Sequence, residues 1–102
     1  MRVDKSLLLL AIENCDLYTL KQRQLLKVLV GLSVNNVVTT DTKFLTEKTQ
    51  LSRPAVYLNI KKFCQEGITT TIKQAGARQN SYQLNQEKLD YIVQLYNNKQ
   101  KI

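Results

Sequence analysis

The excess of basic over acidic side chains is uneven along the chain. Residues 42–82 contain seven basic side chains against two acidic ones, a net charge of +5, whereas residues 1–18 sum to −1. The whole sequence of 102 residues carries +7. Ammonium and guanidinium groups gathered within an ordered domain attract polyanions such as nucleic acids. The alternative is a surface that only keeps the protein soluble, and the positions of these charges must decide between the two.

The other reactive side chains predict no catalysis. The sequence contains no histidine and three scattered glycines, so it lacks a glycine loop that could cradle phosphates. Neither a pair of acidic residues at a catalytic spacing nor a nucleophile motif is present. We therefore expect a protein that is not an enzyme and that uses no cofactor.

The two cysteines, Cys15 and Cys64, do not form a metal-ligand pattern. Without histidine the chain cannot complete a mixed zinc site, and we predict no metal centre. A redox-sensing thiol is one interpretation of these residues. A small, partly buried hydrophobic side chain is the simpler one.

Helices and short strands alternate along the chain. The sequence pattern predicts helices at 5–16, 20–32, 42–49, 53–66 and 86–98, with strands at 37–39, 68–74 and 79–84. Each helix is preceded by a side chain that can cap it: Asp4, Thr19, Asp41, Ser52 and Asn85. Residues 75–78 fit a hairpin tip. The sequence therefore predicts a mainly α fold with a small β hairpin.

Residues 44–63 have the spacing of two helices joined by a short turn. Their inward-facing set is Leu45, Leu51, Val56, Ile60 and Phe63. Pro54 fits the first turn of the second helix, but it disfavours helical geometry at Arg53 before it. Either Ser52 caps a helix that begins at Arg53, or the helix begins one residue later.

Two segments resemble the winged helix-turn-helix DNA-binding proteins, especially the MarR and ArsR types of bacterial regulator. They are the run Leu-Thr-Glu-Lys-Thr-Gln-Leu-Ser-Arg-Pro-Ala-Val-Tyr and the helix exit Phe-Cys-Gln-Glu-Gly-Ile. The resemblance covers about residues 19–84. It implies that helix 53–66 enters the DNA major groove and that hairpin 68–84 forms the wing. A glycine is usual in the turn of such proteins, and Gln50 stands in its place here.

The face of helix 53–66 opposite its inward set carries the candidate DNA contacts. Lys61 and Lys62 can meet phosphates, and Arg53 can pair with guanine or with phosphate. An outward Leu58 could contact a thymine methyl group, or it is an ordinary exposed leucine. The full set on or beside this helix is Ser52, Arg53, Pro54, Tyr57, Leu58, Lys61 and Lys62.

Two further basic residues flank the predicted hairpin tip. Lys73 and Arg78 lie on either side of Gly76. The resemblance implies that the wing contacts the minor groove or the flanking phosphates, and arginine suits a narrow, electronegative minor groove. The alternative is a solvated hairpin turn.

The chain fits one domain, 1–102, with an N-terminal helix in 1–18, a winged core at 19–84 and a C-terminal helix in 85–102. The run 7–12 is apolar all round, and we expect that a monomer of this size cannot bury it. A strand at 6–12 is the competing assignment. The last helix has an amphipathic stripe at 89–96. We predict that this stripe and the apolar first helix form a homodimer, which places two recognition helices on two DNA half-sites.

Three binding functions fit these features. The first is a dimeric transcriptional regulator, the second a replication initiator or partition-type protein of a plasmid or phage, and the third a winged domain that binds protein. The apolar run is too short to cross a bilayer and we recognise no signal peptide. We therefore expect a cytoplasmic protein whose partner is double-stranded DNA, with no membrane partner.

Overall fold

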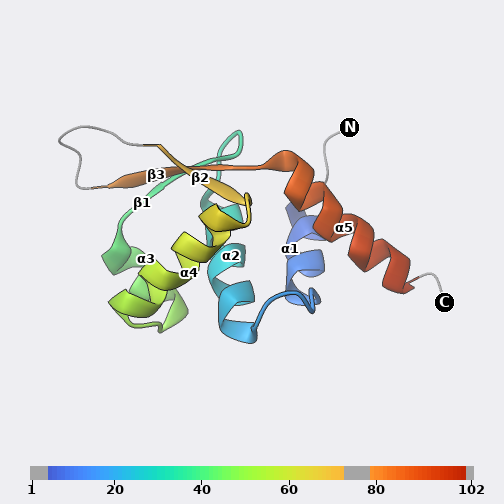
Figure 1. Cartoon of the computed structure of the whole chain (residues 1–102), viewed down its shortest axis with the longest axis horizontal. Helices are drawn as coiled ribbons and strands as arrows, with labels where there is room; N and C mark the ends of the chain where they lie inside the picture. Colours follow the sequence, from blue (N-terminus) through green and yellow to red (C-terminus); the bar gives the residue numbers. More distant parts are fainter. Residues whose placement is uncertain (1–4, 73–78, 101–102) are drawn as a thin grey trace.

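The computed structural model describes residues 5–72 and 79–100, which form five helices and one three-stranded antiparallel sheet. In chain order the elements are α1 (Lys5–Glu13), α2 (Leu20–Leu32), β1 (Val37–Thr40), α3 (Thr42–Thr49), α4 (Arg53–Gln65), β2 (Thr69–Ile72), β3 (Asn80–Leu84) and α5 (Gln86–Gln100). Figure 1 shows the strands lying across one end of α2 and α4, with α5 leading away from the sheet beside α1. The fold is mainly α with a small β element.

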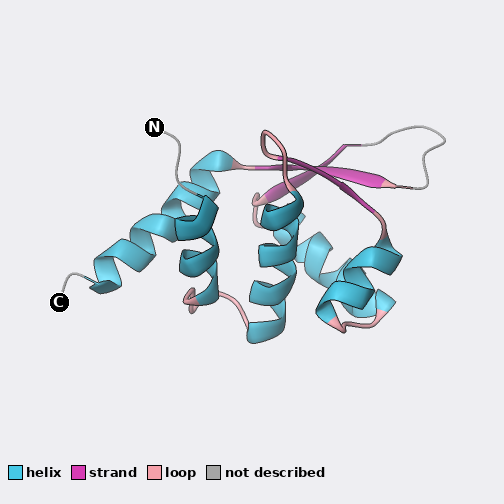
Figure 2. Cartoon of the chain, turned by 180° about the vertical axis from the view of Figure 1, so that it is seen from behind, coloured by secondary structure: helices cyan, strands magenta, loops and turns pink. Residues whose placement is uncertain are grey.

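The sheet has the order β1-β3-β2, so β3 pairs with both other strands. Tyr82 of β3 lies opposite Val38 on one side and Thr71 on the other. Val38, Tyr82 and Leu84 are buried, and Figure 2 shows the helices below the sheet. Burial raises the pKa of Tyr82, so this side chain packs as a neutral group. The strands predicted at 37–39 and 79–84 are present within one residue, and the strand predicted at 68–74 is found at 69–72.

Helix α2 is the centre of the core. Its side chains Leu25, Leu26 and Leu29 are fully buried, and the helix packs against α1, α3, α4 and β1. Fully burying an aliphatic side chain of this size stabilises a fold by about 1.5–3 kcal/mol. Because α2 contacts elements on both sides, it joins the α3–α4 pair to the α1–α5 pair.

Four of the predicted helix caps are formed. Side-chain oxygens of Thr19, Asp41, Ser52 and Asn85 each accept a hydrogen bond from a backbone N–H group two or three residues further along the chain. Such a cap satisfies an N–H that the helix itself leaves unpaired, and it contributes about 1 kcal/mol. Asp4, the fifth predicted cap, lies outside the described residues.

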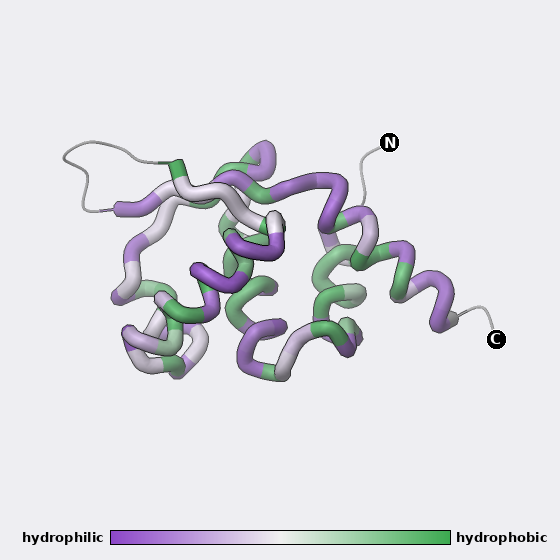
Figure 3. Tube along the Cα trace, in the orientation of Figure 1, coloured by the Kyte–Doolittle hydropathy of each residue, from purple (hydrophilic) through white to green (hydrophobic). Residues whose placement is uncertain are grey.

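The expectation that a monomer cannot bury the first helix is wrong for half of the run 7–12. Leu8, Ala11 and Ile12 are buried because α1 packs against α2 on one side and α5 on the other. Figure 3 shows α1 as hydrophobic over most of its length. Leu10 is the exposed leucine of the run, at 42%. The segment is a helix and not a strand, and it ends at Glu13 instead of Asp16.

The apolar stripe of α5 is buried within the single chain. Leu89, Ile92 and Val93 are buried, and α5 contacts α1. These three side chains were predicted to meet a partner subunit, but in this structure they close the core. Tyr91, on another face of α5, is 52% exposed. Leu95 and Tyr96 of α5 are half-buried, so they and Tyr91 are the side chains of α5 that a partner would meet.

Candidate nucleic-acid interface

Helices α3 and α4 are joined by a tight turn at residues 50–52. Gln50 adopts a left-handed conformation with φ 60° and ψ 19°, and its backbone N–H donates to the carbonyl of Thr46 at 2.9 Å. Its side-chain Nε2 donates to the carbonyl of Glu47 at 2.9 Å. Gln50 therefore adopts the left-handed backbone conformation that normally favours glycine. The two helices and their turn form although the usual glycine is missing.

Apolar contacts fix which face of α4 points outward. All five predicted inward residues are buried: Leu45, Leu51, Val56, Ile60 and Phe63. The helix begins at Arg53 with Ser52 as its N-cap and Pro54 in its first turn, so the first of the two predicted starts is correct. A buried hydroxyl that the sequence did not single out, that of Thr49, donates to the carbonyl of Leu45 at 2.6 Å and accepts from the N–H of Leu51 at 3.3 Å.

Seven of the nine candidate contact residues come together on the exposed face of α4. They are Ser52, Arg53, Pro54, Tyr57, Leu58, Lys61 and Lys62, all exposed. Leu58 is 67% exposed, which is unusual for a leucine in the middle of a helix. The other two candidates, Lys73 and Arg78, lie outside the described residues.

The cations on this face have no acidic partner within the described chain. The three ion pairs found there join Arg23 and Lys99 to Asp16, and Lys27 to Glu13. None of the three involves α3 or α4. The exposed cations of α4 are therefore available to an external anion.

Two more exposed cations lie on α3 and were not among the predicted contacts. Lys43 and Lys48 project from the helix that precedes the turn, and the Lys48 ammonium stands 5.5 Å from the centroid of the Phe44 ring. Their place in the basic stretch 42–82 was the signal that could have identified them. Helix α3 therefore adds two exposed cations to those of α4, beside the exposed carboxylate of Glu47.

Hydrogen bonds from neighbouring elements fix two residues of α4. The Thr42 hydroxyl donates to Tyr57 Oη at 3.3 Å, and Gln22 Nε2 of α2 donates to Asn59 Oδ1 at 3.2 Å. Gln22 and Asn59 are 37 positions apart, so no local sequence pattern links them. These bonds tie α4 to both α3 and α2.

Neither cysteine is in a disulfide. Cys15 is buried at 6% exposure, and Cys64 is half-buried on α4. Cys64 Sγ lies 3.1 Å from Thr69 Oγ1 on β2. In the described part of the chain, no group of three or more His, Cys, Asp or Glu side chains is arranged to hold a metal ion.

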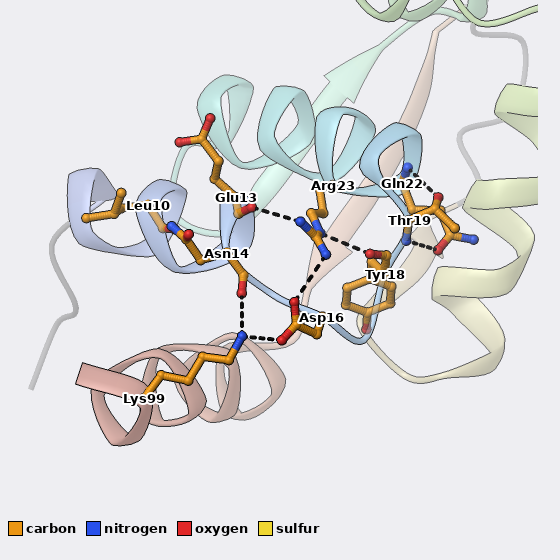
Figure 4. Close-up of polar contacts among 9 residues, drawn as sticks. All are labelled: Leu10, Glu13, Asn14, Asp16, Tyr18, Thr19, Gln22, Arg23 and Lys99. Carbon is orange, nitrogen blue, oxygen red and sulfur yellow. Dashed lines mark hydrogen bonds and ion pairs between the residues drawn. The ribbon is translucent and has the colours of Figure 1, made fainter. Parts of the chain in front are cut away.

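Residues 14–19, at the other end of the molecule, are held by Arg23. Figure 4 shows its guanidinium between three partners. Nε donates to the carbonyl of Tyr18 at 2.9 Å, Nη1 donates to the carbonyl of Glu13 at 3.2 Å, and Nη2 lies 3.5 Å from Asp16 Oδ1. Lys99 of α5 also pairs with Asp16. The hydrogen bond and charge of Lys99 lower the pKa of Asp16 below its usual value.

Tyr18 packs the α1–α2 connection, residues 14–19, against α4. Its ring meets the ring of Phe63 edge-to-face, with centroids 5.7 Å apart. Burial raises the pKa of Tyr18 to about 12, so the phenol stays neutral at physiological pH. The α1–α2 connection is thus in contact with α5 on one side and with α4 on the other.

Within residues 5–72 and 79–100, none of the helices combines the length and apolarity required to cross a bilayer.

No known family profile matches the sequence, and no curated protein matches it. The solved structures that match its architecture include two that cover most of the chain. HlyU from Vibrio cholerae N16961 is 20% identical over 90% of this chain and 87% of its own, with a TM-score of 0.51. A mutant of the type III plasmid segregation protein TubR is 19% identical over 100% of this chain and 98% of its own, with a TM-score of 0.55. At this identity the likeness shows the fold alone, which is a winged helix.

Proposed function

We propose that the chain binds double-stranded DNA sequence-specifically and performs no chemistry on it. Helix α4 enters the major groove, whose width admits an α-helix, and the β2–β3 hairpin serves as the wing. One observation carries the proposal: Arg53, Lys61 and Lys62 project from the exposed face of α4, and no ion pair of the described residues involves them. The likeness to winged-helix structures agrees with this function.

Each residue of the face has a distinct role in this proposal. Lys61 and Lys62 contact phosphates, where a flexible ammonium is sufficient. Arg53, at the helix start, pairs with guanine or phosphate, and the exposed Leu58 contacts a thymine methyl group. Contact of Lys73 and Arg78 with the minor groove rests on the sequence resemblance alone.

The proposal includes a homodimer formed through the terminal helices. Leu10, Leu17 and Tyr91 are exposed there at 42%, 57% and 52%. A largely apolar cavity of about 410 Å³, lined by Leu17, Leu95 and other residues, lies between the α1–α2 connection and α5. Covering this surface would remove apolar area from water. Two copies would then present two α4 helices to two half-sites.

We infer a role as a cytoplasmic transcriptional regulator, with the MarR or ArsR type supported by the sequence resemblance of residues 19–84. A second candidate is plasmid partition or replication initiation. It is favoured by the likeness to TubR, which is a type III plasmid segregation protein. Binding at promoters would support the first role, and binding at a plasmid origin or partition locus the second.

A selection experiment tests the proposal. The purified full chain selects duplex fragments from genomic DNA, and its affinity for a selected duplex and a scrambled duplex is then measured over a salt series. We expect log affinity to fall linearly with log salt, by several units of slope. The selected duplex should bind about 1,000-fold more tightly or better. An absence of duplex binding at low ionic strength would overturn the proposal in favour of a protein-binding winged domain.

A further inference from the structure

A pair of side-chain amides joins α2 to α4. Gln22, only 9% exposed, uses Nε2 to donate to Asn59 Oδ1 at 3.2 Å, while Asn59 Nδ2 donates to the carbonyl of Ala55 at 2.9 Å. Gln22 Oε1 accepts from the backbone N–H of Thr19 at 3.0 Å, as Figure 4 shows. Each amide therefore has both a donor and an acceptor role filled, which fixes its orientation.

The opposite flank of α4 is held in the same way. With about 3.6 residues per turn, Asn59 lies on one flank of the buried apolar stripe, and Tyr57 and Cys64 lie on the other. On that second flank the Thr42 hydroxyl donates to Tyr57 Oη at 3.3 Å, and Cys64 Sγ lies 3.1 Å from Thr69 Oγ1. Helix α4 thus has directional contacts on both sides.

These contacts do what apolar packing does not. Hydrophobic burial is non-directional, so the stripe of α4 sets how deeply the helix sits on the body. Hydrogen bonds weaken steeply when their angle changes, so they resist rotation of the helix about its own axis. Gln22 and Asn59 form the bond of this kind that ties α4 to the central helix of the core.

We propose that the Gln22–Asn59 hydrogen bond positions α4 for base recognition and so determines sequence specificity, an inference that rests on the proposed function. Contacts to base edges need an orientation held to about 10–20°. Phosphate contacts from a lysine tolerate more, because the ammonium is a point charge on a flexible stem. Loss of the bond should therefore reduce discrimination between sequences more than it reduces binding to duplexes in general.

Gln22→Glu removes the N–H donor of this bond with little other change. The new side chain keeps the acceptor for the Thr19 N–H, and at about pH 8 its carboxylate is ionised and has no donor for Asn59. Gln24→Glu is the matched control, because Gln24 is exposed on the same helix and gains the same charge. Asn59→Ala removes the acceptor without any change in charge.

The readout is the ratio of the dissociation constants for a scrambled and a selected duplex, measured with one preparation of each variant. A partly unfolded fraction cancels in this ratio, so a purely structural role would not move it. We expect the ratio to fall about tenfold in Gln22→Glu and in Asn59→Ala, on the scale of one lost base contact. The double variant should fall no further than the larger single effect, and Gln24→Glu should stay within about twofold of the starting protein.

The outcomes separate the two proposals. If the starting protein discriminates between the duplexes and both single variants keep its ratio, the positioning role is overturned and the proposed function stands. An equal loss in Gln24→Glu would assign the effect to charge and would also overturn it. If the starting protein binds no duplex, the proposed function itself fails.

Discussion

The two ends of the molecule use their cations differently. In the region formed by α1, the α1–α2 connection and α5, Arg23 and Lys99 share Asp16, and Lys27 pairs with Glu13. In the region formed by α3 and α4, the exposed lysines and arginine have no such acidic partner among the described residues. Lysine and arginine side chains therefore form ion pairs within the chain at one end of the molecule, and at the other end they are exposed to solvent without such pairs.

The comparison indicates that the ion pairs of individual cations predict a nucleic-acid-binding surface better than the net charge of the chain does. An exposed ion pair contributes about 0–1 kcal/mol, so the pairs of the first region are a small part of its stability. The two carboxylates offset two of the three cations there. No ion pair among the described residues offsets a cation of α3 or α4, so we expect an approaching polyanion to be attracted most strongly to that face.

The largest effect should come from Phe63, where the two regions meet through the ring of Tyr18. Phe63→Ala should lower the free energy of unfolding by about 3–5 kcal/mol, because the side chain is fully buried and leaves a cavity. Denaturant unfolding followed by circular dichroism measures this change. Leu58→Ala, on the exposed face of the same helix, is the control and should change stability by no more than about 0.5 kcal/mol. Equal losses would mean that the inward and outward faces of α4 are wrongly assigned.

The contrast in cations is tested directly by neutralising two lysines at each end. Lys61→Gln with Lys62→Gln should weaken duplex binding by about 10- to 100-fold and reduce the salt slope by about two, because two phosphate contacts are lost. Lys27→Gln with Lys99→Gln changes the net charge equally, and we expect its affinity to stay within about twofold. Fluorescence anisotropy with labelled duplexes over a salt series gives both values. A similar loss in the two double variants would show that total charge alone drives binding.

A smaller effect is expected in the turn of the α3–α4 region. Gln50→Gly should stabilise the protein by about 0.5 kcal/mol, since glycine adopts the left-handed conformation without the steric cost of a β-carbon. Gln24→Gly, at an exposed position inside α2, should instead destabilise it by about 1 kcal/mol. Urea unfolding of both variants provides the comparison. Destabilisation by Gln50→Gly would show that the side-chain hydrogen bond to Glu47 outweighs the backbone conformation.

The smallest effect should come from the paired region and should depend on pH. Lys99 lowers the pKa of Asp16 below its usual 3.8, so the folded chain binds this proton more weakly than the unfolded chain does. The contribution to stability is therefore present above pH 3.8 and is lost as the pH falls through the lower folded pKa. Asp16→Asn should have a Tm slightly below that of the starting protein at neutral pH, and the two Tm values should converge in acid. A difference that does not change with pH would contradict the pairing.

Local signals in the sequence predicted the secondary structure well. The caps Thr19, Asp41 and Ser52 act on residues within three positions, so a short window of sequence contains the whole interaction. The inward set of α4 was predictable for the same reason, because its period follows from helix geometry. The exposed face of α4, and with it most of the candidate site, followed from that period.

Contacts between distant segments could not be predicted in this way. Lys99 and Asp16 are 83 positions apart, and no local pattern indicates that α5 returns to cover α1. The apolar run at 7–12 was therefore assigned to a partner subunit, although α2 and α5 of the same chain bury three of its six residues. The Gln22–Asn59 bond was missed for the same reason, since each amide taken alone resembles any other polar residue on a helix.

One residue, Asn85, separates β3 from α5. Its backbone N–H donates to the carbonyl of Ile68 at 2.8 Å, and its side chain caps the helix. These hydrogen bonds fix the direction in which α5 leaves the sheet. An inserted residue there would turn α5 by about 100° relative to the sheet. If two copies associate through α5, the length of the β3–α5 connection sets the spacing between their hairpins. Insertions or deletions at this point would then alter which half-site separation the pair can span.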